Sequence, residues 1–202
     1  IGIDGLDGTF GEYFVLANHL IHPIPDSLST EKAIYTEPLA AALEILDMLH
    51  IRPSTNVAVI GDGRLALMIA QVVALHGVPL TIIGKHPDKL QLFEKIAKTE
   101  REPNETYEIV IDATGSPSGI ELAKQIVRKR GIIVMKSTYA GTVEMDLSYF
   151  VVNEITIMGS RCGPFEPALE LLNKGLVQLP EIELWDLRDH EKAFASRAFK
   201  VG

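Results

Sequence analysis

The stretch Asn56 to Gln71, N-V-A-V-I-G-D-G-R-L-A-L-M-I-A-Q, contains three local patterns in succession. Residues 57–60 form a short apolar run rich in β-branched side chains, which favours a strand. The segment 61–63 is typical of a tight turn, and residues 64–75 place apolar side chains at helical spacing. The stretch therefore predicts a strand, a glycine turn and a helix.

The glycine turn fits the pattern G-x-G-x-x-G/A, which binds a dinucleotide pyrophosphate when it joins a strand to a helix. Gly61 can adopt backbone angles closed to other residues, and Gly63 leaves the surface bare for the pyrophosphate. Ala66 is small enough for close packing of the helix, whose free N–H groups would face the phosphates. An ordinary strand–turn–helix explains these residues equally well, so the flanking sequence has to decide.

The composition of the 202 residues is that of an ordinary globular protein, with 47% hydrophobic and 23% charged residues. The net charge of -8 argues against nucleic acid as the main partner. No apolar run approaches the length of a membrane span and no signal-peptide pattern opens the chain, so we expect no membrane partner. The single cysteine, Cys162, excludes an internal disulfide and favours the cytoplasm.

The chain begins Ile-Gly-Ile, in the middle of a β-like segment. We therefore expect it to be part of a longer protein, with some of the catalytic residues upstream. Residues 1–25 have the composition of strands and turns, and residues 28–50 have helical apolar spacing that Pro38 interrupts. This predicts a β-rich start and a second helix from about residue 38.

From residue 57 onward, apolar runs alternate with helical patterns, which indicates βαβ units and a mostly parallel sheet. The predicted strands are 57–60, 79–83, 108–113, 131–136 and 155–158, and the predicted helices are 64–76, 87–98, 117–129 and 165–174. The polar residues 99–107 suggest a compressed connection or missing residues, where such folds usually have a further strand. A strand at 182–187 and a helix at 189–196 complete the pattern. The predicted fold class is α/β, a Rossmann-type doubly wound sheet.

The residues after the second strand indicate which cofactor would bind. Folds of this type that prefer NAD place an acidic residue at the end of this strand, where it accepts a hydrogen bond from the ribose 2′-hydroxyl. Here Gly84 stands in that position, followed by Lys85 and His86. Two cations in place of a carboxylate suit a 2′-phosphate, which favours NADP while NAD stays possible. An ordinary solvated turn before a helix is the alternative.

Three consecutive strands are followed by small or polar residues, and parallel strands bring such ends to one edge of the sheet. The segments are 112–117, 137–141 and 159–163. Ser116 and Pro117 are explained by capping of the next helix, which leaves Thr114 and Gly115 for a ligand. We therefore expect a ligand-binding edge.

At this point the sequence resembles the zinc-dependent medium-chain alcohol and polyol dehydrogenases, in particular their sorbitol and threonine dehydrogenase-like branch. The motifs that carry the resemblance are D-G-L-D-G-T-F-G-E-Y at 4–13, E-P-L-A at 37–40, the glycine turn at 61–66, D-A-T-G-S-P at 112–117 and M-G-S-R-C-G at 158–163. The resemblance implies that residues 1–35 are the end of a GroES-like catalytic domain. Residues 36–202 would then be the dinucleotide-binding domain.

The resemblance also implies roles for individual residues. In the cofactor site, Gly61, Gly63 and Leu65 would form the pyrophosphate turn, Lys85 and His86 would bind the 2′-phosphate, Thr114 and Thr138 would line the ribose and nicotinamide, and Ser160 and Arg161 would lie nearby. Glu37 falls where the sorbitol branch places a glutamate at or near the catalytic zinc, and a carboxylate is an acceptable zinc ligand. A helix-start carboxylate before Pro38 is an equally good interpretation of Glu37.

Other features of the family are absent from this sequence. It has no G-H-E motif and no four-cysteine lobe, and its six histidines show no ligand spacing. We therefore expect zinc to be bound only by the full-length protein, and the catalytic residues of this chain are unknown. The whole protein would oxidise a small alcohol or polyol with NADP, and the strand at 155–158 would pair subunits into a homodimer or homotetramer.

Two other classes of protein remain open. A non-catalytic or metal-free nucleotide-binding module, such as a redox sensor or truncated homologue, would share the glycine turn. A methyltransferase also has a glycine turn after its first strand, but it usually has an acid where Gly84 stands.

Overall fold

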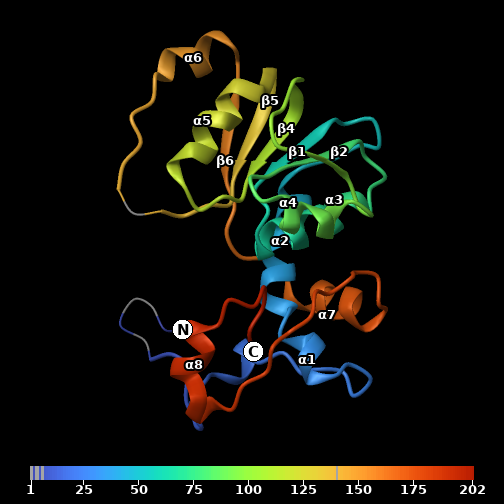
Figure 1. Cartoon of the computed structure of the whole chain (residues 1–202), viewed down its shortest axis with the longest axis vertical. Coiled ribbons are helices and arrows are strands. Elements are labelled where there is room, and N and C mark those ends of the chain that lie inside the picture. Colours follow the sequence, from blue (N-terminus) through green and yellow to red (C-terminus); the bar gives the residue numbers. More distant parts are fainter. Residues whose placement is uncertain (1, 3–4, 6, 140) are drawn as a thin grey trace.

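The computed structural model describes residues 2, 5, 7–139 and 141–202 (Figure 1). Its centre is a six-stranded sheet in the order β3-β2-β1-β4-β5-β6, in which every neighbouring pair is parallel. The strands are β1 (Val57–Ile60), β2 (Leu80–Ile83), β3 (Lys98–Glu100), β4 (Tyr107–Asp112), β5 (Val127–Met135) and β6 (Thr156–Gly159). This order is that of a doubly wound dinucleotide-binding fold, which confirms the predicted fold class.

Both faces of the central strands β1, β2 and β4 are buried, as their apolar runs require. Along β1, Val57 and Val59 point into one core cluster while Ala58 and Ile60 point into the other. This alternation is the two-residue period of a strand. All four side chains are at most 4% exposed, so β1 is the central strand of both cores.

Helices cover the two faces. The first face carries α2 (Thr36–Met48) and α3 (Arg64–Ala74), and α7 (Phe165–Asn173) packs against α2. The second face carries α5 (Pro117–Ile126) and α6 (Leu147–Val152). The remaining helices are α1 (Thr30–Ala33), α4 (Pro87–Leu90) and α8 (His190–Ala195), with 3-10 turns at Asn18–Leu20, Gln91–Phe93 and Leu187–Asp189.

The helix predicted over 87–98 is wrong in its second half. The α-helix α4 ends at Leu90, and after a 3-10 turn the chain enters β3 at Lys98. Phe93 is fully buried in the core, and β3 finds a backbone partner in residues 81–83 of β2. The further strand that the polar residues 99–107 left in doubt is therefore present as the three-residue edge strand β3, whose charged residues gave no apolar signal.

Other boundaries shift for local reasons. The helix predicted to reach residue 129 ends at Ile126, because β5 already begins at Val127 and pairs with Tyr107. The second helix begins at Thr36 rather than at Pro38. A helix tolerates Pro38 in its first turn, because the N–H groups there have no partner within the helix. The helix α6 was not predicted from the sequence. Its N-cap is Asp146, whose side chain accepts a hydrogen bond from the Ser148 N–H at 2.9 Å.

The two ends of the chain contain little regular structure. Before α1, the described residues form one 3-10 turn and no strand, so the predicted β-rich start is wrong for them. A strand needs a partner to satisfy its backbone, and the described segment has none. Asp4 and Leu6 of the first motif lie outside the described residues. At the other end, the strand predicted at 182–187 is a single parallel bridge between Glu183 and Val201.

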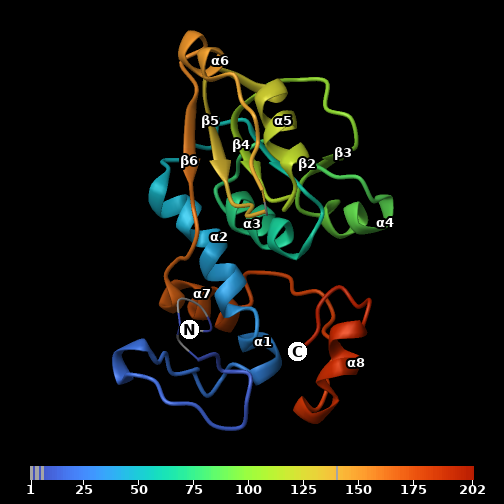
Figure 2. The ribbon, with the colours of Figure 1, turned by 90° about the vertical axis from the view of Figure 1, so that its left-hand side faces the viewer.

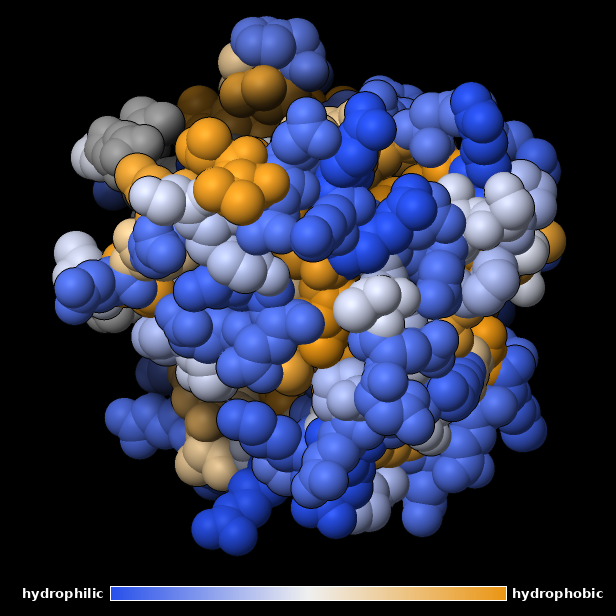
Figure 3. All heavy atoms as spheres, turned by 90° about the horizontal axis from the view of Figure 1, so that it is seen from above, coloured by the Kyte–Doolittle hydropathy of each residue, from blue (hydrophilic) through white to orange (hydrophobic). Residues whose placement is uncertain are grey.

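The end segments lie together beneath the carboxyl edge of the sheet. The helix α2 runs from the sheet down to them (Figure 2), and the ring of Phe10 lies 5.6 Å from that of Phe194 in α8. The opposite end of the molecule, seen from above in Figure 3, is largely hydrophilic with small hydrophobic areas. None of the helices in the described ranges has the length and hydropathy of a membrane-crossing segment.

Substitution of Gly61 tests how closely the chain after β1 approaches the chain after β4. Its φ is +127°, and a Cβ there would lie 2.8 Å from the carbonyl oxygen of Ala113. Gly61→Ala should therefore lower the free energy of unfolding by about 1–3 kcal/mol for the backbone conformation, with the steric contact adding to this. The matched control is Gly77→Ala, which has φ +65° but no atom within 4 Å of the added Cβ. Chemical denaturation should give the larger loss for Gly61→Ala, and equal losses would contradict the contact.

Candidate functional site

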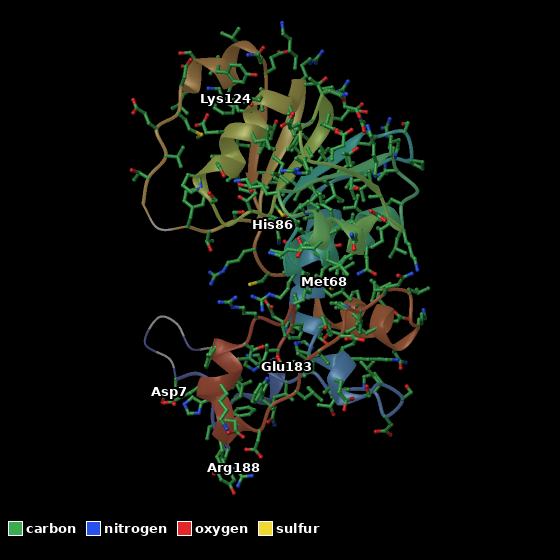
Figure 4. The ribbon with its side chains drawn as sticks, in the orientation of Figure 1. Asp7, Met68, His86, Lys124, Glu183 and Arg188 are labelled. Carbon is green, nitrogen blue, oxygen red and sulfur yellow. The ribbon has the colours of Figure 1, made fainter. Side chains whose placement is uncertain are left out.

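Four parallel strands end at one edge of the sheet and form one wall of a cavity of about 1090 Å³. Pockets for small molecules and cofactors usually measure roughly 300–1,000 Å³. Its lining comprises Tyr35, Glu37, Pro38, Ala41, Gly63, Arg64, Leu65, Met68, Ala113, Thr114, Gly115, Met135, Lys136, Ser137, Thr138, Gly159, Ser160, Arg161, Pro180, Phe199 and Lys200. In Figure 4 the labelled Met68 lies near this edge, between the sheet and the end segments.

The glycine turn presents bare backbone to this cavity. Gly63 is the N-cap of α3 with an extended conformation, and a Cβ added there would meet no atom within 4 Å. No side chain caps the helix, and its first turn contains no acidic residue. The free N–H groups of this first turn are therefore open to an anion.

Two cations and one carboxylate lie around the same turn. Arg64 begins α3, and Lys200 comes from the end of the chain. Burial lowers the pKa of Lys200, and the charge of Arg64 lowers it further, while Glu37 opposes both effects. The ammonium group of Lys200 also lies 5.6 Å from the centre of the Tyr35 ring. This side of the cavity is therefore positive and suited to phosphate.

A hydrogen-bond network built on Asp112 fixes the loop after β4. The buried Asp112 accepts hydrogen bonds at Oδ1 from the Thr114 N–H at 2.9 Å, the Thr114 hydroxyl at 2.8 Å and the Ser137 hydroxyl at 3.1 Å. The Gly115 N–H donates to Ser137 Oγ at 2.8 Å. The loops after β4 and β5 are thus held together, and both Thr114 and Thr138 line the cavity.

Lys136 was not singled out from the sequence. It directly follows the apolar residues 132–135 at the end of β5. Its Nζ donates to the Ala41 carbonyl at 2.6 Å, the Arg161 carbonyl at 2.9 Å and Ser160 Oγ at 3.1 Å. Burial lowers its pKa, against the charges of Glu44, Cys162 and Glu37. Lys136 therefore joins α2 to the segment after β6. A lysine directly after the hydrophobic residues 132–135 was the available signal.

The carboxylate of Asp62 occupies the space beside Gly84. Its Oδ2 accepts hydrogen bonds from the Lys85 and His86 N–H groups, both at 2.8 Å, and lies 2.9 Å from His86 Nδ1. Burial tends to raise the pKa of Asp62, but the hydrogen bonds from His86 and Lys85 and the His86 charge together lower it. Asp62 was not among the predicted site residues, although its place between the two glycines was visible.

The cavity brings most of the predicted site residues together. Its lining includes Glu37, Gly63, Leu65, Thr114, Thr138, Ser160 and Arg161. Gly61 lies behind the turn against Ala113, and Lys85 and His86 lie beyond Asp62, outside the lining. The residues missing from the sequence-based set are chiefly Arg64, Lys136, Ser137 and Lys200, which come from the start of α3, the end of β5 and the C-terminal segment.

The described residues offer too few grouped donors for a metal ion. Within the described ranges, no three His, Cys, Asp or Glu side chains group so as to hold a metal ion. Glu37 lines the cavity without such partners, so the residues present do not make up a zinc site. Its assignment as a zinc ligand stays a prediction.

Comparison with known proteins gives relatives over nearly the whole chain. D-xylulose reductase A of Aspergillus oryzae is 25% identical over 213 residues, covering 93% of this chain and 60% of that protein. The sorbitol dehydrogenase of Halalkalibacterium halodurans is 25% identical over 217 residues, covering 97% of this chain and 63% of that protein. The chain is therefore similar in sequence to polyol dehydrogenases over nearly its whole length. This confirms the family resemblance, although no family model matches the chain.

Solved structures of dehydrogenases share the fold. A structure described as a zinc-binding dehydrogenase from Sinorhizobium meliloti bound to NADP has a TM-score of 0.84 at 20% identity, covering 96% of this chain and 65% of that one. An Escherichia coli protein described as a short chain alcohol dehydrogenase, in complex with NADH, has a TM-score of 0.82 at 21% identity, covering 94% and 62%. The chain thus spans about 60% of the length of the polyol dehydrogenases that it matches.

The ionised carboxylate of Asp62 should stabilise the fold in a pH-dependent way. Its pKa in the folded chain lies below the usual 3.8, so the stabilisation is fully present above that value and is lost as the pH falls through the folded-state pKa. Asp62→Asn cannot titrate. The difference in free energy of unfolding between the two proteins should therefore be constant near neutral pH and shrink below about pH 4. Denaturant titrations across this range measure it, and a difference independent of pH would contradict the assignment.

Proposed function

We propose that this chain is the cofactor-binding part of an alcohol or polyol dehydrogenase of the medium-chain type, with NADP as its cofactor. The whole protein would interconvert a small alcohol or polyol and its carbonyl compound in the cytoplasm. The observation that carries the proposal is the bare backbone of Gly63 at the start of α3, which faces a cavity of cofactor size. The relation to the polyol dehydrogenases supports it.

The pyrophosphate would lie against the start of α3. The backbone at Gly63 and Leu65 would donate hydrogen bonds to the phosphate oxygens, as expected for a free helix N-terminus. Arg64 and Lys200 line the same part of the cavity, and they would neutralise the two negative charges. Gly61 would act indirectly, because it lets the turn pass close to Ala113.

The choice of NADP is supported by the loop after β2. Gly84 has no space for a side chain, so the acid that would bind a 2′-hydroxyl is missing from that position. The exposed Lys85 and His86 follow it, and they would bind the 2′-phosphate. Both NADP and NADH appear in the solved structures that share this fold.

In the reaction, the bound nicotinamide would supply the acceptor for the hydride of an alcohol carbon. Thr114 and Thr138 would hold the ribose and the nicotinamide in place at the ends of β4 and β5, and Ser160 and Arg161 would close the far side. Asp112 orients this edge through its bonds to Thr114 and Ser137. The described residues of this chain hold no complete zinc site.

Replacement of Gly63 should separate binding from folding. The side chain of Gly63→Val would point into open space at the first Cβ position, so the midpoint of thermal unfolding should change little. It would occupy the place of the pyrophosphate, so the affinity for NADPH should fall at least about tenfold, equivalent to 1.4 kcal/mol. Fluorescence titration with NADPH measures this. Unchanged affinity in a folded variant would refute the assigned site.

The activity of the whole protein needs a separate experiment. The chain and a version extended upstream of Ile1 are assayed side by side with NADP and a panel of polyols, together with metal analysis. Turnover by the extended protein alone supports the proposal, and turnover by the chain alone would refute the need for upstream residues. Dinucleotide binding by both without any turnover would favour the non-catalytic module instead.

The open edge of the sheet supports self-association. The edge strand β6 pairs with β5, and Ile157 on it is 39% exposed. We expect two subunits to pair along this strand, giving a homodimer or homotetramer. Ile157→Lys should yield a monomer in light scattering, because a charge disfavours edge pairing. A monomeric unmodified chain would contradict this assembly.

A further inference from the structure

One buried carboxylate connects the two loops that would hold the phosphates. Asp62 lies between Gly61 and Gly63 in the turn after β1, while Lys85 and His86 follow β2. The side chain of Asp62 is only 10% exposed, against 56% for His86. It accepts the two consecutive backbone N–H groups of Lys85 and His86 at 2.8 Å each. The loop after β2 is therefore fixed directly to the glycine turn.

The same carboxylate orients the imidazole of His86. Asp62 Oδ2 and Oδ1 lie 2.9 and 3.1 Å from His86 Nδ1, so this nitrogen carries the hydrogen. The carboxylate fixes the orientation of the ring through this contact, and the exposed remainder of the ring faces solvent. His86 is thereby held in a fixed position beside the glycine turn. Figure 4 labels it at the carboxyl edge of the sheet.

Asp62 also explains why position 84 must be a glycine. A Cβ at Gly84 would lie 2.7 Å from a methyl carbon of Leu90 and 2.8 Å from both Cβ and Oδ2 of Asp62. An acidic side chain on the end of β2 therefore has no room. The carboxylate that occupies this space is already engaged by three donors from Lys85 and His86, so little of its acceptor capacity is left for a ribose hydroxyl.

We propose that Asp62 is a positioning residue that makes the cofactor site select a 2′-phosphate over a 2′-hydroxyl. This inference rests on the proposed function, and it assigns the selectivity to a residue that does not itself touch the phosphate. Asp62 acts by holding Lys85 and His86 toward the ligand and by keeping a competing acid out of position 84. Selectivity is a difference between two affinities, and both parts of this arrangement contribute to it.

The test is the isosteric variant Asp62→Asn. It keeps the size of the side chain but puts an amide donor opposite the Lys85 and His86 N–H groups, and it removes the negative charge beside His86. The ratio of the dissociation constants for NADH and NADPH should fall about tenfold. The change should come from weaker NADPH binding, with NADH binding nearly unaltered. The matched control is Asp88→Asn, which makes the same chemical change at an exposed residue of α4. It should leave the ratio unchanged.

A second variant covers the case in which Asp62→Asn does not fold. Gly84→Ala would displace the carboxylate of Asp62 by contact instead of removing it, and the ratio should fall in the same direction. Binding of NADH to each variant shows that the site is intact. An unchanged ratio in a variant that binds both dinucleotides would overturn the role of Asp62 and leave the proposed function standing. Failure of the unmodified chain to bind either dinucleotide would overturn the proposed function.

Discussion

The cavity depends on the place in the sheet where the order of the strands reverses. The chain leaves β1 toward β2 on one side, whereas β4 lies on the other side and leads away to β5. The loops after β1 and β4 therefore diverge and leave a crevice between them. Gly61 determines how close the two loops are where they begin to diverge, because its backbone lies against the carbonyl of Ala113 with no space for a side chain. The bare turn at Gly63 and the loop at Thr114 face each other across the crevice as a result.

Polar networks then give the crevice its fixed shape. Asp112 joins the loops after β4 and β5, Asp62 joins those after β1 and β2, and Lys136 joins β5 to α2 and to the segment after β6. Each of these groups is buried and bonds mainly to backbone or hydroxyl groups. Buried polar groups of this kind rigidify a site when their partners are present. The edge is thus organised by three charged side chains, of which Lys136 lines the cavity while Asp62 and Asp112 lie behind its lining.

The sequence predicted the central part of the sheet well, because the strands there are apolar on both faces and glycine turns mark the ends of several of them. It failed where tertiary contacts overrode local pattern. The edge strand β3 is charged and depends on β2 for its hydrogen bonds, and the start of the chain lacks a partner strand within the described residues. In the site, the glycines and threonines were recognisable by their motif. Lys136, Lys200 and Asp62 were not recognisable, because their roles depend on contacts with residues that are distant in the sequence. The nearest of these partners, Lys85, is 23 positions from Asp62.

The bonds of Lys136 also have a mechanical consequence. Its ammonium group is tied to the carbonyl of Ala41 in α2 and to Ser160 and Arg161. A side chain at Gly163 would overlap the carbonyl oxygen of Ala40, so the backbone there lies directly on the same helix. Glu37, one turn earlier on α2, is therefore carried on the same rigid wall as the segment after β6. Any group that Glu37 holds therefore stays at a fixed distance from the carboxyl edge of the sheet.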